Sequence, residues 1–214
     1  MADVKVIKNE EGCSCGGGEK VQVKVYNKMT PTQLLMDFAA DETKLDTGSM
    51  SALSAACSAA LLERCAKIAA ANNESTERLE WLARNSGTLK NYFIHLIEDD
   101  TRCRGPLRRA FAEGGQSEID ACIPAATEIN AEIVNMLCQL LDLVKETAAY
   151  MPESDRHYAV ESAELAMGAI KASISRIIAF SAMSTDETFR FVAKRENELM
   201  LQGAEKVYNE IITL

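Results

Sequence analysis

Three consecutive carboxylates, Glu98, Asp99 and Asp100, end an apolar helical stretch and are the first candidates for chemistry in this chain. A carboxyl group positioned beside a reacting atom can give and take a proton, which is the task of a general acid–base catalyst. Asp100 comes three residues after Ile97 and seven after Phe93, so on a helix it shares the face that these apolar side chains bury. The alternative is a solvated helix end, in which all three carboxylates face water. The spacing favours Asp100 as the catalytic carboxylate.

Arginines follow this acidic run at positions 102, 104, 108 and 109. Arg104 and Arg108 are four positions apart, so on a helix they project from one side and can clamp a carboxylate or a phosphate. The alternative is pairing within the protein, with the acidic run itself. The two histidines, His95 and His157, have no Cys, Asp or Glu partner at a convincing metal-ligand spacing, so we predict no metal site around them.

A run of small residues lies between Leu45 and Leu61, which reads L-D-T-G-S-M-S-A-L-S-A-A-C-S-A-A-L. A helix that starts at Gly48-Ser49 leaves backbone N–H groups unpaired at its N-terminus, and such groups can hold an anion or a polar heterocycle. Small side chains equally suit tight helix–helix packing, so this segment alone does not decide between ligand binding and architecture. Gly48 and Ser49 are candidate binding residues.

The elements that must position these residues are helices joined by short loops, which predicts an all-α antiparallel bundle. Caps, apolar periodicity and breakers place the helices at Pro31 to about Asp41, Ser49 to Ala71, Ser75 or Thr76 to Asp99-Asp100, Gly105-Pro106 to Gly114-Gly115, Ser117 to Ala149, Met151-Pro152 to about Ala182, and Ser184 or Thr185 to Ile212.

The N-terminal segment differs from this helical body. Valines alternate with polar residues on either side of E-G-C-S-C-G-G-G-E, which is typical of a β-hairpin. We therefore divide the chain into an arm at 1–28, with β-hairpin character, and a helical domain at 29–214. Cys13 and Cys15 supply only half of a tetrahedral zinc shell, so a flexible turn is favoured over a metal or redox role for the arm.

Composition excludes some classes of function. A net charge of −9 over 214 residues argues against nucleic acid as a partner, and no apolar run is long enough to span a membrane. The seven cysteines, with no secretory signal before them, predict reduced thiols and a cytoplasmic protein. Small residues on more than one face of two helices predict a homodimer.

The order of these features resembles the formiminotetrahydrofolate cyclodeaminase / methenyltetrahydrofolate cyclohydrolase family over about residues 30–212. Four segments carry the resemblance. The family's P-G-G-G-S, L-I-D-E-D-A-x-A-F, Val-Pro and K-D-E-x-F are similar to Leu45–Ser49, Leu96–Arg104, Ile123-Pro124 and Thr185–Phe189. The resemblance implies an all-helical, dimeric enzyme of folate one-carbon metabolism. Its substrate would be a tetrahydrofolate derivative, and no permanently bound cofactor or metal would be needed.

The resemblance also implies roles for individual residues. Asp100 matches the last acid of the family's D-E-D and would be the catalytic acid–base group. Thr47, Gly48 and Ser49 match the substrate-binding turn, and Arg104 would hold the anionic tail of the folate.

The chain departs from the family pattern at several of its polar positions. Asp46 and Thr47 replace two glycines of the opening turn, and Tyr158 stands where the family has a second Asp. Arg176 and Phe180 stand in place of two asparagines. Tyr158 and Arg176 are therefore candidate substrate-binding residues peculiar to this chain. The alternative is a catalytically degenerate family member that acts as a ligand-binding or assembly protein.

Overall fold

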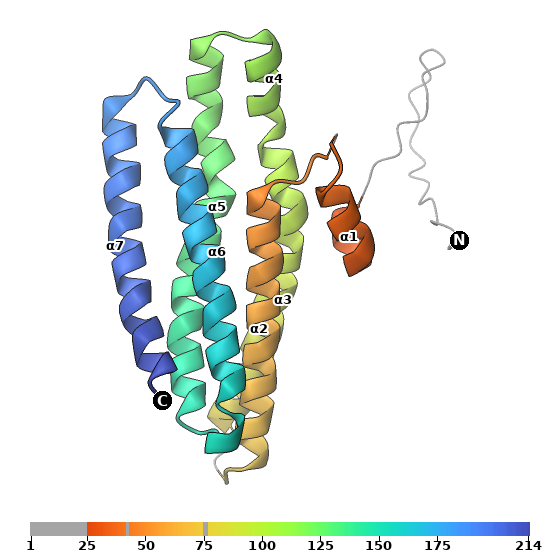
Figure 1. The fold of residues 1–214 in the computed structure, drawn as a ribbon, viewed down its shortest axis with the longest axis vertical. Coiled ribbons are helices and arrows are strands. Elements are labelled where there is room, and N and C mark those ends of the chain that lie inside the picture. Colours follow the sequence, from red (N-terminus) through yellow and green to blue (C-terminus); the bar gives the residue numbers. More distant parts are fainter. Residues whose placement is uncertain (1–24, 42, 75–76) are drawn as a thin grey trace, which may run out of the picture.

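The computed structural model describes residues 25–41, 43–74 and 77–214. Within these residues the structure is all-α, as the sequence predicts, and contains no strand. Five long helices run along the molecule as a bundle, and α4 lies at one end of it (Figure 1). The elements in chain order are η1 Tyr26–Lys28, α1 Pro31–Phe38, α2 Thr47–Ala71, α3 Glu77–Cys103, α4 Gly105–Glu113, α5 Gln116–Ala148, η2 Glu153–Asp155, α6 His157–Ser181 and α7 Glu187–Ile212.

Helix α2 packs against α3, α5 and α6. Its neighbours can approach closely because most of the side chains that α2 turns toward them are alanine or serine. Helix α6 is likewise rich in small buried residues and contacts α2, α5 and α7. The small-residue run that the sequence singles out is therefore part of the bundle core.

Helix starts differ from the sequence prediction where an aspartate acts as the cap. Asp46 has an extended backbone and accepts the N–H of Thr47 at 2.7 Å, so α2 begins two residues before the predicted Ser49. Asp186 caps α7 by accepting the N–H of Phe189 at 3.0 Å, in place of the predicted Ser184 or Thr185. Helix α1 ends at Phe38 rather than near Asp41.

Helix α3 continues beyond the acidic run and ends at Cys103. Asp100 therefore lies inside the last turn of a helix, not at its solvated end, and its side chain is turned toward the core. This geometry favours the buried alternative over the solvated one for Asp100. Glu98 and Asp99 are only partly buried.

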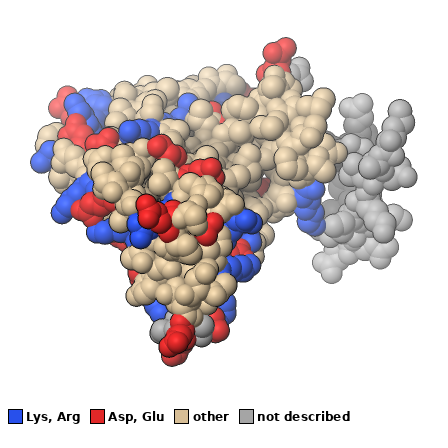
Figure 2. All heavy atoms as spheres, turned by 60° about the horizontal axis from the view of Figure 1, so that its bottom comes forward, with Lys and Arg blue, Asp and Glu red and all other residues tan. Residues whose placement is uncertain are grey.

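The predicted β-hairpin arm falls almost entirely outside the described residues, and so do Cys13 and Cys15. From Val25 onward the chain joins the helical body, because Tyr26 is buried in the same core as α2 and α6. None of the described helices is long and apolar enough to cross a membrane. Acidic and basic side chains are interspersed on the face shown in Figure 2.

Candidate functional site

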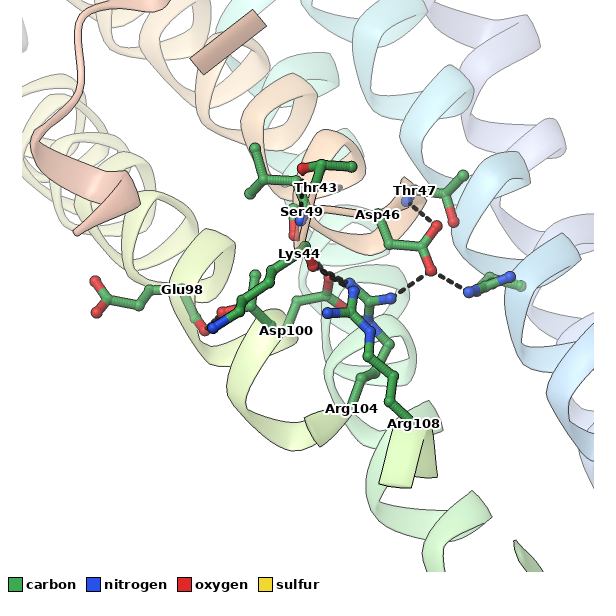
Figure 3. A network of polar contacts seen from close by, with 12 residues as sticks. Thr43, Lys44, Asp46, Thr47, Ser49, Glu98, Asp100, Arg104 and Arg108 are labelled. Atoms are coloured by element: carbon green, nitrogen blue, oxygen red, sulfur yellow. Dashed lines mark hydrogen bonds and ion pairs between the residues drawn. The ribbon is translucent and has the colours of Figure 1, made fainter. Parts of the chain in front are cut away.

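Asp100 lies at the end of the bundle where α2 begins and α3 ends, and its side chain is only 1% exposed. Its Oδ2 accepts a hydrogen bond from Ser49 Oγ at 2.7 Å. Arg104, one turn further on, donates from Nε to Oδ1 at 3.2 Å and from Nη2 to Oδ2 at 2.9 Å. Figure 3 shows these three side chains converging. A buried carboxylate is stable only when it is paired in this way, so Ser49 and Arg104 hold Asp100 in a fixed orientation.

Gly48 allows the first turn of α2 to approach this carboxylate. A Cβ on Gly48 would lie 2.3 Å from Asp100 Oδ1 and 3.1 Å from Asn130 Nδ2. The first distance is far below van der Waals contact, so glycine is the residue that fits here. The structure thus gives Gly48 a steric role, which is to leave room for Asp100.

Asp46 connects α2 to two arginines. Its Oδ1 accepts the Thr47 N–H, while its Oδ2 accepts from Arg104 Nη1 and from Arg176 Nη2. Thr47 takes part through its backbone, as the first residue of α2. We call Asp46, Arg104 and Arg176 the aspartate bridge, because a single carboxylate joins arginines at the ends of α3 and α6.

Arg108 adds a third guanidinium beside the bridge. It donates to the backbone carbonyl of Lys44, to which Arg104 also donates (Figure 3). Burial, and next the positive charge of Arg104, lower the pKa of Arg108. Arg104 and Arg108 thus lie together as their spacing predicts, and Arg104 is paired within the protein.

A pocket of about 180 Å³ opens beside the aspartate bridge. The Arg176 guanidinium lies 4.0 Å from the centre of the Phe180 ring, a cation–π geometry. The walls combine three guanidinium groups, one carboxylate and two aromatic rings: Asp46, Arg104, Leu107, Arg108, Phe111, Arg176 and Phe180. Such a set suits an anionic ligand with a flat portion, since guanidinium groups bind carboxylate and phosphate through paired hydrogen bonds.

Residues 30–199 match the family model described as formiminotransferase-cyclodeaminase. The chain belongs to this family. Among solved structures it is similar to formiminotetrahydrofolate cyclodeaminase from Thermotoga maritima, with a TM-score of 0.78 and 14% identity. That match covers 86% of this chain and 94% of the other. A search of curated proteins gives no match. The family resemblance and the helical-bundle fold expected from the sequence are thereby confirmed.

The structure of this cyclodeaminase-family member does not bring Tyr158 to the site. Its hydroxyl accepts from Arg64 Nη2 at 3.2 Å, and the Arg64 guanidinium lies 4.6 Å from the centre of its ring. Tyr158 is the second residue of α6, whereas Arg176 lies near the end of that helix. At about 1.5 Å per residue they are about 27 Å apart along it. Tyr158 and Arg176, both predicted to bind substrate, thus lie far apart along α6 within one protomer.

Asn130 is a site residue that the sequence reading missed in this cyclodeaminase-family chain. It lies on α5, is 1% exposed, and has its amide nitrogen next to Gly48. The available signal is its place in an apolar helical series, seven residues after Ile123 and seven before Leu137, both of which are fully buried. A polar residue at such a position needs an explanation.

No group of three or more His, Cys, Asp or Glu residues within the described part of the chain could hold a metal ion. The five cysteines in that part are free thiols: Cys57, Cys65, Cys103, Cys122 and Cys138.

Proposed function

We propose that this protein is a folate one-carbon enzyme, a cyclodeaminase or a cyclohydrolase, and that Asp100 is its general acid–base residue. The observation that carries the proposal is the buried Asp100 carboxylate, held by Ser49 and Arg104 at the glycine start of α2. It lies in a chain of the formiminotransferase-cyclodeaminase family, whose similar structure from Thermotoga maritima is named a formiminotetrahydrofolate cyclodeaminase.

Both reactions need one group that moves a proton. In cyclodeamination the N10 nitrogen of the folate attacks the formimino carbon, and ammonia leaves after taking up a proton. In the cyclohydrolase reaction water adds to the methenyl carbon and gives up a proton, and one C–N bond of the bridge then breaks as its nitrogen takes up a proton. A carboxyl group that accepts a proton in one step and returns it in the next serves either reaction. Ser49, whose hydroxyl donates to Asp100 Oδ2, fixes the orientation of that group.

The arginine pocket is the place we propose for the anionic part of the folate. Arg108 and Arg176 line it, and Phe180 offers a flat apolar wall. Asp46 neutralises part of this positive charge when no ligand is bound. A substrate carboxylate of the same charge would compete with Asp46 for Arg104 and Arg176.

Access to Asp100 is part of the same proposal. The pocket walls include Asp46, Arg104 and Arg176 but not Asp100, which is buried on the inner side of the aspartate bridge. Opening the bridge would join the pocket to the carboxylate. Arginine side chains are long and can change rotamer without moving the helices, so this requires no change of fold.

A homodimer also belongs to the proposal. Helices α2 and α6 turn small or apolar residues outward as well as toward the core, among them Leu53, Cys57, Leu165, Gly168 and Ala172. Light scattering after size-exclusion chromatography should give a mass near twice 23.4 kDa. A monomer at all concentrations would contradict this part.

Turnover of 5-formimino- and 5,10-methenyl-tetrahydrofolate by the purified protein tests the function. The absorbance of the methenyl product or substrate reports the rate. Asp100→Asn should lower kcat at least about 100-fold, because it removes the proton carrier. The control is Asp99→Asn, which alters the neighbouring carboxylate that pairs with Arg102, and it should stay within about twofold of wild type. If the wild-type protein neither turns over either substrate nor is thermally stabilised by any folate, the proposal fails.

A catalytically degenerate binding protein is the second candidate. It is favoured by the aspartate bridge, in which the chain's own carboxylate occupies arginines that would otherwise meet a ligand. It predicts thermal stabilisation by folates without turnover, and an affinity that Asp100→Asn leaves unchanged.

A further inference from the structure

Asn130 is buried without hydrogen bonds. Neither Oδ1 nor Nδ2 has a hydrogen-bond partner among the residues that the structure describes, although the residue is only 1% exposed. A buried amide that leaves its donors and acceptors unpaired is destabilising, so its presence calls for a physical reason.

A buried asparagine on a helix of this bundle can be satisfied locally. Asn197 on α7 donates from Nδ2 to the carbonyl of Ala193, four residues earlier, at 2.7 Å. Asn130 makes no such bond to its own helix. Its amide is instead directed across the bundle, toward the start of α2, where Nδ2 lies 3.1 Å from the position of a Cβ on Gly48.

That same point lies 2.3 Å from Asp100 Oδ1. Asn130 and Asp100 therefore face each other across Gly48, one from α5 and the other from α3. The two polar groups differ in that Asp100 is hydrogen-bonded by Ser49 and Arg104, whereas the Asn130 amide is unused. The donor and the acceptor of the Asn130 amide are both free to form hydrogen bonds with a bound ligand, and they lie beside the paired Asp100 carboxylate.

Two more buried hydroxyls on the helices around Asn130 also lack partners in the described chain. Ser51 lies three residues after Gly48 on α2, and Ser173 lies three residues before Arg176 on α6. Each is thus one helical turn from a residue of the site. Unpaired hydrogen-bonding groups are therefore found on three of the helices that pack together here, namely α2, α5 and α6.

We propose that Asn130 is a substrate-binding residue that orients the nitrogen-bearing one-carbon group of the folate beside Asp100. This rests on the proposed function. An amide presents one donor and one acceptor side by side, which is complementary to an amidine-like or amide-like edge of a ligand. The formimino group, N–CH=NH, offers an N–H donor and a lone-pair acceptor on its imine nitrogen, and the oxygen or the nitrogen of the Asn130 amide can bind these. Because Asn130 lies opposite Asp100, a group that Asn130 binds would lie next to the carboxylate that transfers the proton.

The test compares stability and catalysis in the same variant. Asn130→Leu keeps the branching of the side chain at Cγ and removes the unpaired amide. We expect a Tm equal to or above that of wild type, because no hydrogen bond is lost, together with a kcat/KM at least tenfold lower for the formimino substrate. The folate-induced rise in Tm should shrink as well. Asn197→Leu serves as the control and should leave kcat and KM unchanged.

Asn130→Ser is a second variant, to be used if Asn130→Leu does not fold. Serine is smaller than asparagine and offers a hydroxyl in place of the amide. A kcat/KM within twofold of wild type in either variant overturns the inference, and so does a loss of activity that only follows a fall in Tm. If the wild-type protein turns over folates and the Asn130 variants are fully active, this inference fails while the proposed function stands. A wild type without any response to folates removes the proposed function, and this inference with it.

Discussion

Ser58 on α2 and Ser162 on α6 hydrogen bond to each other's backbone in both directions. Ser58 Oγ donates to the carbonyl of Ser162 at 2.7 Å, and Ser162 Oγ donates to the carbonyl of Ser58 at 2.9 Å. Both residues are fully buried. Because each hydroxyl needs a carbonyl at one position of the other helix, the pair fixes the register of α2 against α6. That register places Asp46 at the start of α2 next to Arg176 near the end of α6.

Alanine at either position of this serine pair should lower stability. We expect Ser58→Ala and Ser162→Ala each to reduce the free energy of unfolding by about 1 kcal/mol, and the double variant to lose less than the sum, because the two bonds support one another. Urea denaturation measures all three. Ser154→Ala, at an exposed position, is the control. Strict additivity would show that the two hydroxyls act independently.

Gly48→Ala should disturb the site strongly, although it adds only one methyl group. The added methyl group would overlap Asp100, so we expect a loss of stability of roughly 2 kcal/mol or more and a strong loss of turnover. Gly203→Ala on α7 is the matched control, since a Cβ there meets nothing within 4 Å. It should be neutral, or stabilising by up to about 1 kcal/mol. Equal Tm values for the two variants would contradict the steric role of Gly48.

Asp46→Asn should strengthen the binding of anions. Asparagine still caps α2, so the helix keeps its start, but Arg176 loses its negative partner and Arg104 keeps only Asp100. We expect a larger rise in Tm with inorganic phosphate and with folate than in wild type, equivalent to roughly fivefold tighter binding, or about 1 kcal/mol. Asp186→Asn alters the cap of α7, away from the site, and should respond as wild type does. A weaker response of Asp46→Asn would mean that Asp46 itself contacts the ligand.

Glu63 should make stability depend on pH in acid. Hydrogen bonds from Lys67 and from Lys90, each 2.5 Å long, lower the pKa of Glu63 below its usual 4.5. The folded pKa is thus below the unfolded one, so the stabilisation is fully present above pH 4.5 and is lost as the pH falls through the folded pKa. We expect Glu63→Gln to be less stable than wild type at pH 7, and the difference to shrink at pH 3. Urea denaturation at both pH values measures it.

The control for this pH effect is Glu128→Gln, at an exposed position on α5. Its difference from wild type should be small at both pH values. A Glu63→Gln difference that stays constant between pH 7 and pH 3 would contradict the ion-pair explanation.

Local rules were sufficient for the helices and for the burial of Asp100, because apolar spacing and breakers act over a few residues. The aspartate bridge was not predictable in this way. It joins Asp46 to Arg176, which are 130 positions apart, and depends on how α2 and α6 pack. The distance between Tyr158 and Arg176 within one protomer follows from the length of α6 and could be read from the sequence once the helix was predicted.

The close approach of Gly48 to Asp100 also limits the order in which this protein can evolve. A side chain at position 48 becomes tolerable only after the residue at position 100 has become smaller or has turned away, because a Cβ would lie 2.3 Å from its carboxylate. The reverse order passes through an overpacked intermediate. Descendants that lose both residues should therefore lose the aspartate first and the glycine afterwards. A glycine that persists without its aspartate would then mark a lineage in which the carboxylate was lost recently.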